Sequence, residues 1–173
     1  LGVIPPMILV QALLAAANTF PKETGLGWDQ LHPRALNRLS QDVILWVCAV
    51  LHNAERTGKW PEAAELVLIA LLPKAEGGFR AIGLMPRLPR LWMRNRKHVA
   101  AEWEASMQKP YIYAGKKMGA TVAAWKQGFR AELAAENGRT VNYCEALLDL
   151  VKAFDLVPHW VLIREGLNLG YPL

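Results

Sequence analysis

The distribution of hydrophobic and polar residues predicts a helical N-terminal part, a strand hairpin and further helices. The first apolar stretch, Met7–Ala17, predicts a helix over residues 7–18. It is too short to span a bilayer, and Gln11 interrupts it. We therefore expect a buried or partner-facing helix rather than a membrane span or a signal peptide.

A longer helical pattern follows a loop that we place at 24–29. Apolar residues recur at helical spacing from Pro33 to Arg56, which predicts one long helix. Gly58 should end it, because glycine readily adopts the left-handed conformation that follows many helices. The residues expected on its buried face are Leu36, Leu39, Val43, Trp46, Val47 and Val50.

Two short apolar runs, Leu66–Leu72 and Phe79–Leu84, have the length of strands. The segment between them is polar, and it ends in Gly77 and Gly78, which can adopt positive φ. This pattern predicts a β-hairpin with a flexible, basic tip.

Helical spacing returns after the hairpin. It predicts one helix over 88–107 and another over Ala120–Glu136. Val141–Leu148 then has the pattern of a buried strand, and Asp155–Leu169 has that of a helix. Pro158 is compatible with this last helix only in its first turn, because proline cannot donate a backbone hydrogen bond.

The composition is that of a folded protein. Of the 173 residues, 53% are hydrophobic and 20% are charged, which suffices for a core. Cys48 and Cys144 lack the spacing of a zinc site, and two such cysteines suit a reducing compartment. With no repeat or low-complexity tract, one domain is the simplest organisation. We expect an intracellular protein, in the nucleus or the cytoplasm.

The net charge of +5 is distributed unevenly. Residues 84–130 contain ten Lys or Arg and two Glu, a local balance of +8, while the rest of the chain has a balance of −3. One stretch therefore carries the whole positive excess. This is expected of a surface that faces a polyanion such as nucleic acid.

The stretch 147–159 carries the most specific chemistry. It reads LLDLVKAFDLVPH, in which Asp149 follows an apolar run and precedes a helical segment. A carboxylate at the end of a buried strand can hold a hard cation such as Mg²⁺. Asp149 alone is more typical of an ordinary strand end followed by a helix cap than of a metal site. The whole string, however, resembles the first catalytic motif of reverse transcriptases of the non-LTR retrotransposon and group II intron type.

The resemblance implies a role for each residue of the motif. Asp149 would be a catalytic ligand of two Mg²⁺ ions, and the backbone carbonyl of Leu150 would join one of them. The amides near Lys152 and Ala153 would contact phosphate oxygens of the deoxynucleoside triphosphate. Phe154 would lie under the sugar and exclude a 2′-hydroxyl.

The hairpin tip is the second part of the resemblance. Family members hold the triphosphate with basic residues on a fingers hairpin, and Lys74 and Arg80 occupy matching positions. Arginine can engage two phosphate oxygens at once, whereas lysine acts as a point charge. The alternative is an ordinary hairpin with solvated charges.

A basic stripe on the helix after the hairpin is the third part. Its residues recur at steps of three and four, which places them on one helix face, where the family has its template–primer path. A solvated basic face above an apolar core is the alternative. The residues of this stripe are Arg87, Arg90, Arg94 and Lys97.

The resemblance spans about 24–173 and implies an α+β fold. It divides the chain into an N-terminal helical segment (1–23), a fingers-like region (24–140) and the start of a palm (141–173). Helices would pack on the fingers hairpin and on a small antiparallel palm sheet. The chain contains no aromatic-Ala-Asp-Asp turn. We therefore expect a fragment that needs a further palm segment and a thumb, and that is inactive alone.

The expected function is magnesium-dependent transfer of nucleotides from deoxynucleoside triphosphates to a DNA primer on an RNA template. No membrane partner is expected. One alternative is a non-catalytic, basic, nucleic-acid-binding remnant of a retroelement. Another is a helical interaction protein in which the Asp149 motif is a coincidence.

Overall fold

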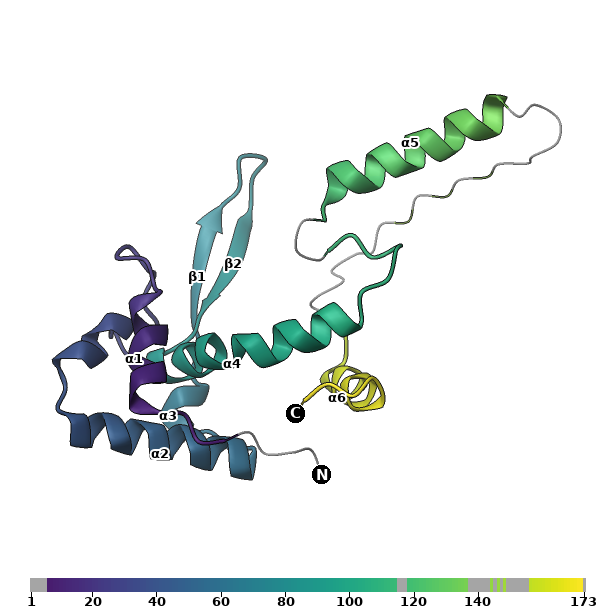
Figure 1. Cartoon of the computed structure of the whole chain (residues 1–173). Coiled ribbons are helices and arrows are strands. Elements are labelled where there is room, and N and C mark those ends of the chain that lie inside the picture. Colours follow the sequence, from purple (N-terminus) through teal and green to yellow (C-terminus); the bar gives the residue numbers. More distant parts are fainter. Residues whose placement is uncertain are drawn as a thin grey trace. The chain divides into compact units, whose positions relative to one another are not determined.

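The computed structural model describes residues 6–114, 118–136, 144, 146, 148 and 156–172 (Figure 1). Over these residues the chain is mixed α+β, with seven helices and a two-stranded antiparallel sheet. The chain divides into two compact units, Leu1–Val99 and Ala100–Leu173.

The first unit combines helices with the sheet, and the hairpin extends away from the helices of this unit (Figure 1). Helix α4 begins in this unit and ends in the second one, which also holds two later helices. In chain order the elements are α1 (Val10–Asn18), η1 (Pro33–Arg38), α2 (Gln41–Thr57), α3 (Glu62–Glu65), β1 (Leu68–Pro73), β2 (Phe79–Leu84), α4 (Arg87–Ser106), α5 (Ala120–Glu136) and α6 (His159–Asn168).

The core of the first unit is formed mainly by α1, η1, α2 and the start of α4. Helix α1 is buried along one side, as expected for the apolar stretch that begins at Met7. Each fully buried leucine stabilises the fold by about 1.5–3 kcal/mol relative to exposure. The core cluster comprises Ile8, Leu13, Ala17, Phe20, Leu36, Ile44, Cys48, Leu51 and Leu91.

The prediction of one long helix from Pro33 to Arg56 is wrong. The first part is the short 3₁₀ helix η1, and Leu39 then adopts an extended conformation with φ −92° and ψ 152°. Ser40 is also extended, and it precedes α2 as the N-cap residue. Serine favours this position over a helix interior, because its side chain competes with helical hydrogen bonding. Gly58 ends α2 with φ 66°, as predicted.

The predicted buried face is correct only in part. Leu36 is fully buried and Val47 packs against the core, but other members of the predicted set are exposed. Trp46 is 74% exposed and Val43 is 44% exposed. The buried side of the helix instead carries Ile44, Cys48, Leu51 and Ala54. The sequence could not decide between the two sides, because α2 is apolar on both.

A buried ion pair between α2 and α4 lies on the inward side of α2. Glu55 lies one turn after Leu51, and only 4% of its side chain is exposed. It accepts hydrogen bonds from Arg96 Nε at 2.5 Å, Arg96 Nη2 at 2.9 Å and Trp92 Nε1 at 2.7 Å. Arg96 Nη2 also donates to the Pro6 carbonyl at 2.6 Å. Glu55 thus continues the buried side of α2, which packs against α1, and these bonds link that side to α4.

The predicted hairpin is confirmed. Strand β1 begins two residues later than expected, β2 has the expected bounds, and the strands pair antiparallel from Leu68–Leu84 to Pro73–Phe79. Both faces of the hairpin expose hydrophobic side chains. Leu71 and Phe79, on one face, are 60% and 65% exposed, and Leu72, on the other, is 48% exposed.

In the second unit, α5 has the predicted bounds, whereas α6 begins four residues later than predicted. Pro158 is the N-cap residue of α6. Proline disfavours a helical conformation in the residue before it, so the helix does not begin earlier in the chain. Trp103 connects the end of α4 to the end of α6. Its Nε1 donates to the Leu169 carbonyl at 2.9 Å, and its ring packs edge-on against Tyr171.

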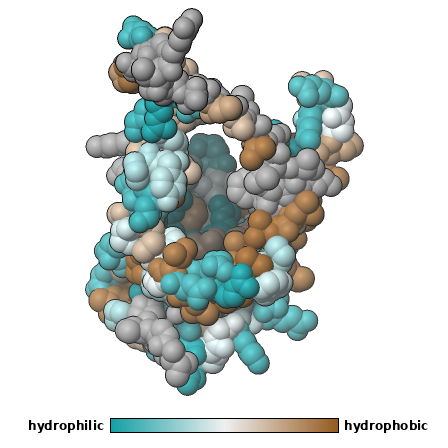
Figure 2. Space-filling model, turned by 90° about the vertical axis from the view of Figure 1, so that its right-hand side faces the viewer, coloured by the Kyte–Doolittle hydropathy of each residue, from teal (hydrophilic) through white to brown (hydrophobic). Residues whose placement is uncertain are grey.

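The predicted strand 141–148 lies mostly outside the described residues. Cys144, Ala146 and Leu148 are described; they are exposed and belong to no helix or strand. Helices α5 and α6 have no buried side chains, and brown, hydrophobic residues lie at the surface in Figure 2. No helix within the described ranges is both long and apolar enough to cross a membrane.

The Glu55–Arg96 pair predicts an unequal response to loss of a carboxylate. Glu55→Ala should lower the free energy of unfolding by about 3–5 kcal/mol, because it leaves Arg96 buried without its counter-charge. The exposed Arg164–Glu165 pair offers a matched control, and Glu165→Ala should cost less than about 1 kcal/mol. Urea unfolding followed by circular dichroism measures both. Equal, small losses would contradict a structural role for the buried pair.

Candidate nucleotide and nucleic-acid site

The residues of the Asp149 motif lie outside the described part of the chain. This holds for Asp149, Leu150, Lys152, Ala153 and Phe154. Their roles therefore stay predictions. Within the described residues, no group of three or more His, Cys, Asp or Glu side chains could hold a metal ion.

The hairpin tip is a tight turn that depends on its two glycines. Gly77 N donates to the Lys74 carbonyl at 3.1 Å, and Lys74 N donates to the Gly78 carbonyl at 3.0 Å. Gly77 and Gly78 have φ values of 90° and 80°, which residues with a Cβ rarely adopt. The turn was predicted from these glycines, and its backbone is as expected.

The strand register places the two candidate clamp residues on one face of the hairpin. Arg80 pairs with Leu72, so their side chains point to the same side. Lys74 follows Leu72 by two residues, and continuing the alternation places it on this side too. Between them lies Gly78, which has no side chain. Lys74 and Arg80 are both exposed, so this face presents two cations beside an open backbone.

The base of the hairpin is fixed by the loop before η1. A Cβ atom on Gly27 would lie 2.6 Å from the Met85 carbonyl oxygen, so only glycine allows this close approach. Two residues on, Asp29 Oδ2 accepts a hydrogen bond from Arg87 N at 2.8 Å. Arg87 is the first residue of α4, so the carboxylate caps this helix from a distant part of the sequence. The loop thereby sets the direction of α4 relative to β2.

Two residues of the basic stripe are used inside the fold. Arg90 Nη1 donates to the Gly25 carbonyl at 2.6 Å. Burial lowers the pKa of the Arg87 guanidinium, and the nearby Asp29 carboxylate opposes this. Burial also lowers the pKa of Arg90, again opposed by Asp29. Arginine nevertheless remains charged at neutral pH. Arg90 therefore acts mainly as a structural residue of the α4 start. The Arg87 guanidinium is partly buried, but its Nε has no hydrogen-bond partner among the described residues.

The other two residues of the stripe remain exposed. The Arg94 guanidinium lies 4.6 Å from the centre of the Phe20 ring, and Arg90 lies over the same ring at 5.3 Å. Stacking on Phe20 restrains Arg94 while its side chain stays accessible. Lys97 is exposed one turn further along α4. The polyanion-facing part of the stripe is thus smaller than the sequence predicted.

Of the tryptophans Trp28 and Trp60, Trp60 packs against the core, whereas Trp28 is 43% exposed. Trp28 Nε1 donates to the Ala63 carbonyl at 3.0 Å. Trp60 contacts Trp92 edge-on, with ring centres 5.7 Å apart. His32 caps η1, as its Nδ1 accepts from Arg34 N at 3.1 Å.

Sequence reasoning missed the long-range partners of this region. Neither Asp29 nor Glu55 was expected to contact α4. The only local signal for Asp29 was its position two residues after Gly27. For Glu55 the sequence offers no distinct signal, because its neighbours Asn53 and Arg56 are polar as well.

Comparison of the chain with protein-family models, with curated proteins and with solved structures found no match in any of the three.

Removal of the Asp29 cap tests the link between the loop and α4. Asp29→Ala should lower the free energy of unfolding by about 0.5–2 kcal/mol, because the first N–H of α4 loses its acceptor. Asp42→Ala is the control. Asp42 lies in the first turn of α2, a helix whose N-cap side chain makes no hydrogen bond. Urea unfolding measures both variants. A larger loss for Asp42 than for Asp29 would contradict the capping role.

Proposed function

We propose that this chain is the fingers and the beginning of the palm of a reverse transcriptase of the non-LTR retrotransposon and group II intron type. The observation that carries the proposal is the hairpin tip. It presents Lys74 and Arg80 on one face, and the later segment 147–159 resembles the first catalytic motif in sequence.

The geometry of the tip suits a triphosphate. Polyphosphate oxygens carry several negative charges, and a forked guanidinium can bind two of them. Gly78 leaves the backbone between the two cations accessible, so an anion can approach closely. No carboxylate lies on the face shared by Lys74 and Arg80 in the register of β1 and β2.

The motif would supply the catalytic chemistry. Mg²⁺ bound to Asp149 and to the Leu150 carbonyl would neutralise the charge that develops during nucleotide transfer. Lys152 and Ala153 would contribute backbone amides to the phosphates, and Phe154 would select against ribonucleotides. The substrates are a deoxynucleoside triphosphate, an RNA template and a DNA primer.

Arg94 and Lys97 are the residues that we assign to template or primer phosphates. Both are exposed and follow each other along α4, and neither side chain has an ion-pair partner among the described residues. Arg87 and Arg90 are assigned to the fold instead, because their guanidinium groups are partly buried.

A non-catalytic nucleic-acid-binding remnant is the second candidate function. The uneven charge favours it, because the +8 balance of residues 84–130 needs no catalytic carboxylate. The two candidates differ at Asp149, which only the polymerase requires.

The assignment of Arg94 and Lys97 to phosphate contacts predicts how duplex binding should depend on salt. The double variant Arg94→Gln/Lys97→Gln should weaken binding and reduce the slope of log K against log salt by about 0.9 for each lost phosphate contact. Arg90→Gln should instead lower stability and leave the slope nearly unchanged. Fluorescence anisotropy of a labelled RNA–DNA duplex at several salt concentrations measures the slope. An unchanged slope in the double variant would show that Arg94 and Lys97 are solvated and make no phosphate contact.

The clamp assignment predicts weaker triphosphate binding after removal of either tip cation. Lys74→Gln and Arg80→Gln should each reduce the affinity for a fluorescent deoxynucleoside triphosphate roughly 10- to 100-fold, as expected for charge-assisted hydrogen bonds. Arg80→Lys should restore only part of the loss, because lysine binds phosphate as a point charge. Arg38→Gln, at the end of η1, is the control and should bind normally.

In a protein that joins this chain to the later palm carboxylates, Asp149→Asn should abolish primer extension without unfolding the protein. Phe154→Ala should keep extension and admit ribonucleotides. Extension at the wild-type rate by the Asp149→Asn variant would refute the catalytic role of Asp149. No extension by the wild-type form of this protein would refute the polymerase proposal and leave the remnant.

A further inference from the structure

The outer side of α2 presents an aromatic surface that neither the core nor the proposed polymerase site uses. Trp46 is 74% exposed on the side opposite Cys48 and Leu51. The aliphatic neighbours Val43 and Leu45 are 44% and 45% exposed, so they are more than half covered. The most accessible apolar group on this side is therefore a flat indole ring.

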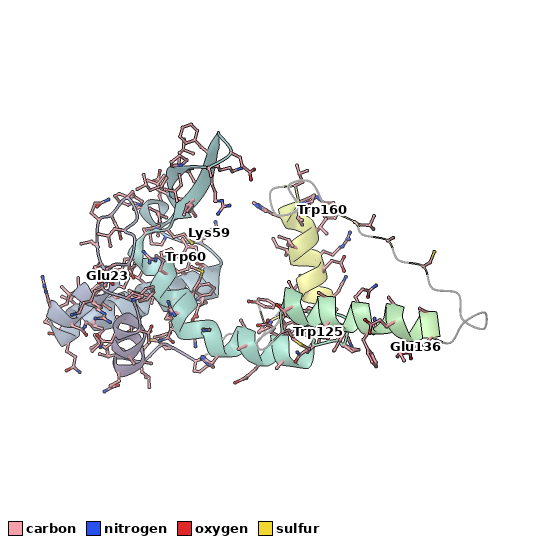
Figure 3. All side chains as sticks on the ribbon, turned by 90° about the horizontal axis from the view of Figure 1, so that it is seen from above. Glu23, Lys59, Trp60, Trp125, Glu136 and Trp160 are labelled. Carbon is pink, nitrogen blue, oxygen red and sulfur yellow. The ribbon has the colours of Figure 1, made fainter. Side chains whose placement is uncertain are left out.

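A groove lies beside this ring, at the C-terminal end of α2. Its volume is about 540 Å³, which is in the range of small-ligand sites. Lys59 and Trp60, which line it, follow α2 directly and are labelled in Figure 3. The complete lining is Trp46, Ala49, Val50, Asn53, Thr57, Lys59, Trp60 and Pro61.

The polar groups of the groove that remain available to a ligand are one amide donor and one cation. Asn53 Oδ1 accepts from Arg56 Nη2 at 3.2 Å, and this bond orients the amide. Thr57 Oγ1 donates to the Asn53 carbonyl and accepts from Lys59 N. Within the described residues, Asn53 Nδ2 and Lys59 Nζ make no hydrogen bond or ion pair. The lining contains no carboxylate.

We propose that this groove binds single-stranded nucleic acid. One base stacks on Trp46, the Asn53 amide donates to the edge of a base, and Lys59 contacts a backbone phosphate. Stacking on an aromatic side chain beside a cation is how single strands are bound without strict sequence preference. The site shares no residue with the hairpin clamp or with Arg94 and Lys97, so it stands independently of the polymerase proposal.

The exposure pattern favours a nucleic acid over a helical peptide. Val43 and Val50 recur with Trp46 at helical spacing, as a docked helix would require, but both are less exposed than the indole ring. A base needs only an open ring face, which Trp46 provides. The positive charge of Lys59 and the absence of a lining carboxylate complement a phosphate backbone.

Anisotropy of fluorescein-labelled (dT)₁₂ and of an abasic strand of the same length tests the proposal. Trp46→Ala should weaken (dT)₁₂ binding about 5- to 150-fold, the range that loss of one stacked base implies. Trp46→Phe should retain most of the affinity. Abasic-strand binding should be equal in wild type and Trp46→Ala, because only phosphate contacts remain.

Two controls locate the effect. Trp125 on α5 is 78% exposed, so Trp125→Ala removes an equally accessible tryptophan and should leave (dT)₁₂ binding unchanged (Figure 3). Lys74→Gln/Arg80→Gln should also leave it unchanged, which separates this site from the clamp. Lys59→Gln should reduce the salt slope by about 0.7, the value for one contact on a single strand.

Three results would overturn the proposal. The first is (dT)₁₂ binding by Trp46→Ala equal to that of wild type while circular dichroism shows both to be folded. The second is equal binding of the abasic strand and (dT)₁₂ by wild type. The third is a dimer, seen in sedimentation, that the Trp46→Ala substitution abolishes but that added (dT)₁₂ does not dissociate. This result would make the outer side of α2 an interface between two copies of the chain.

Discussion

The buried carboxylate of Glu55 is the interaction on which the first unit depends most. Three N–H donors from Trp92 and Arg96 surround it, so one carboxylate links α2 to α4. A buried charge with one partner removed is costly, and alternative packings of these helices would leave Glu55 or Arg96 unpaired. Since α4 begins where the hairpin ends, this pair also restrains the hairpin base. The second restraint, Asp29 on the first turn of α4, lies at the other end of the same helix segment.

Local structure was largely predictable, because it depends on nearby residues. Gly77 and Gly78 specify the hairpin turn through their backbone freedom, and α5 has a helical pattern from end to end. The break between η1 and α2 was missed, because the apolar spacing continues across it and only Ser40 signals a cap. The choice of buried side in α2 could not be made from the spacing alone. It depends on contacts with distant parts of the chain, such as that between Glu55 and Arg96, 41 residues apart in the sequence.

In the candidate site, too, nearby residues determine the features that were predictable, and residues distant in the sequence determine those that were not. The sequence predicted that Lys74 and Arg80 flank a turn, and the register adds that they share a face. It also predicted that four cations share one side of α4, but two of them have partners in the loop before η1. Arg90 is held by the Gly25 carbonyl, and the Arg87 amide is held by Asp29. Helical spacing identifies a face, whereas contacts from elsewhere in the chain decide how much of it stays accessible.

The stacking of Arg94 on Phe20 bears directly on how such a face can bind a polyanion. A long flexible side chain loses rotamer freedom when it contacts a phosphate, and this cost weakens binding. At 4.6 Å from the ring centre, the Arg94 guanidinium is already restrained on one face, while its side chain remains exposed. Folding has therefore already removed part of the rotamer freedom of Arg94, so less side-chain entropy is lost when it contacts a phosphate. Phe20 itself is 4% exposed and belongs to the core cluster, so the packing that stabilises the first unit also orders its exposed cation. Lys97 has no ring beneath it among the described contacts and should contribute less per charge than Arg94.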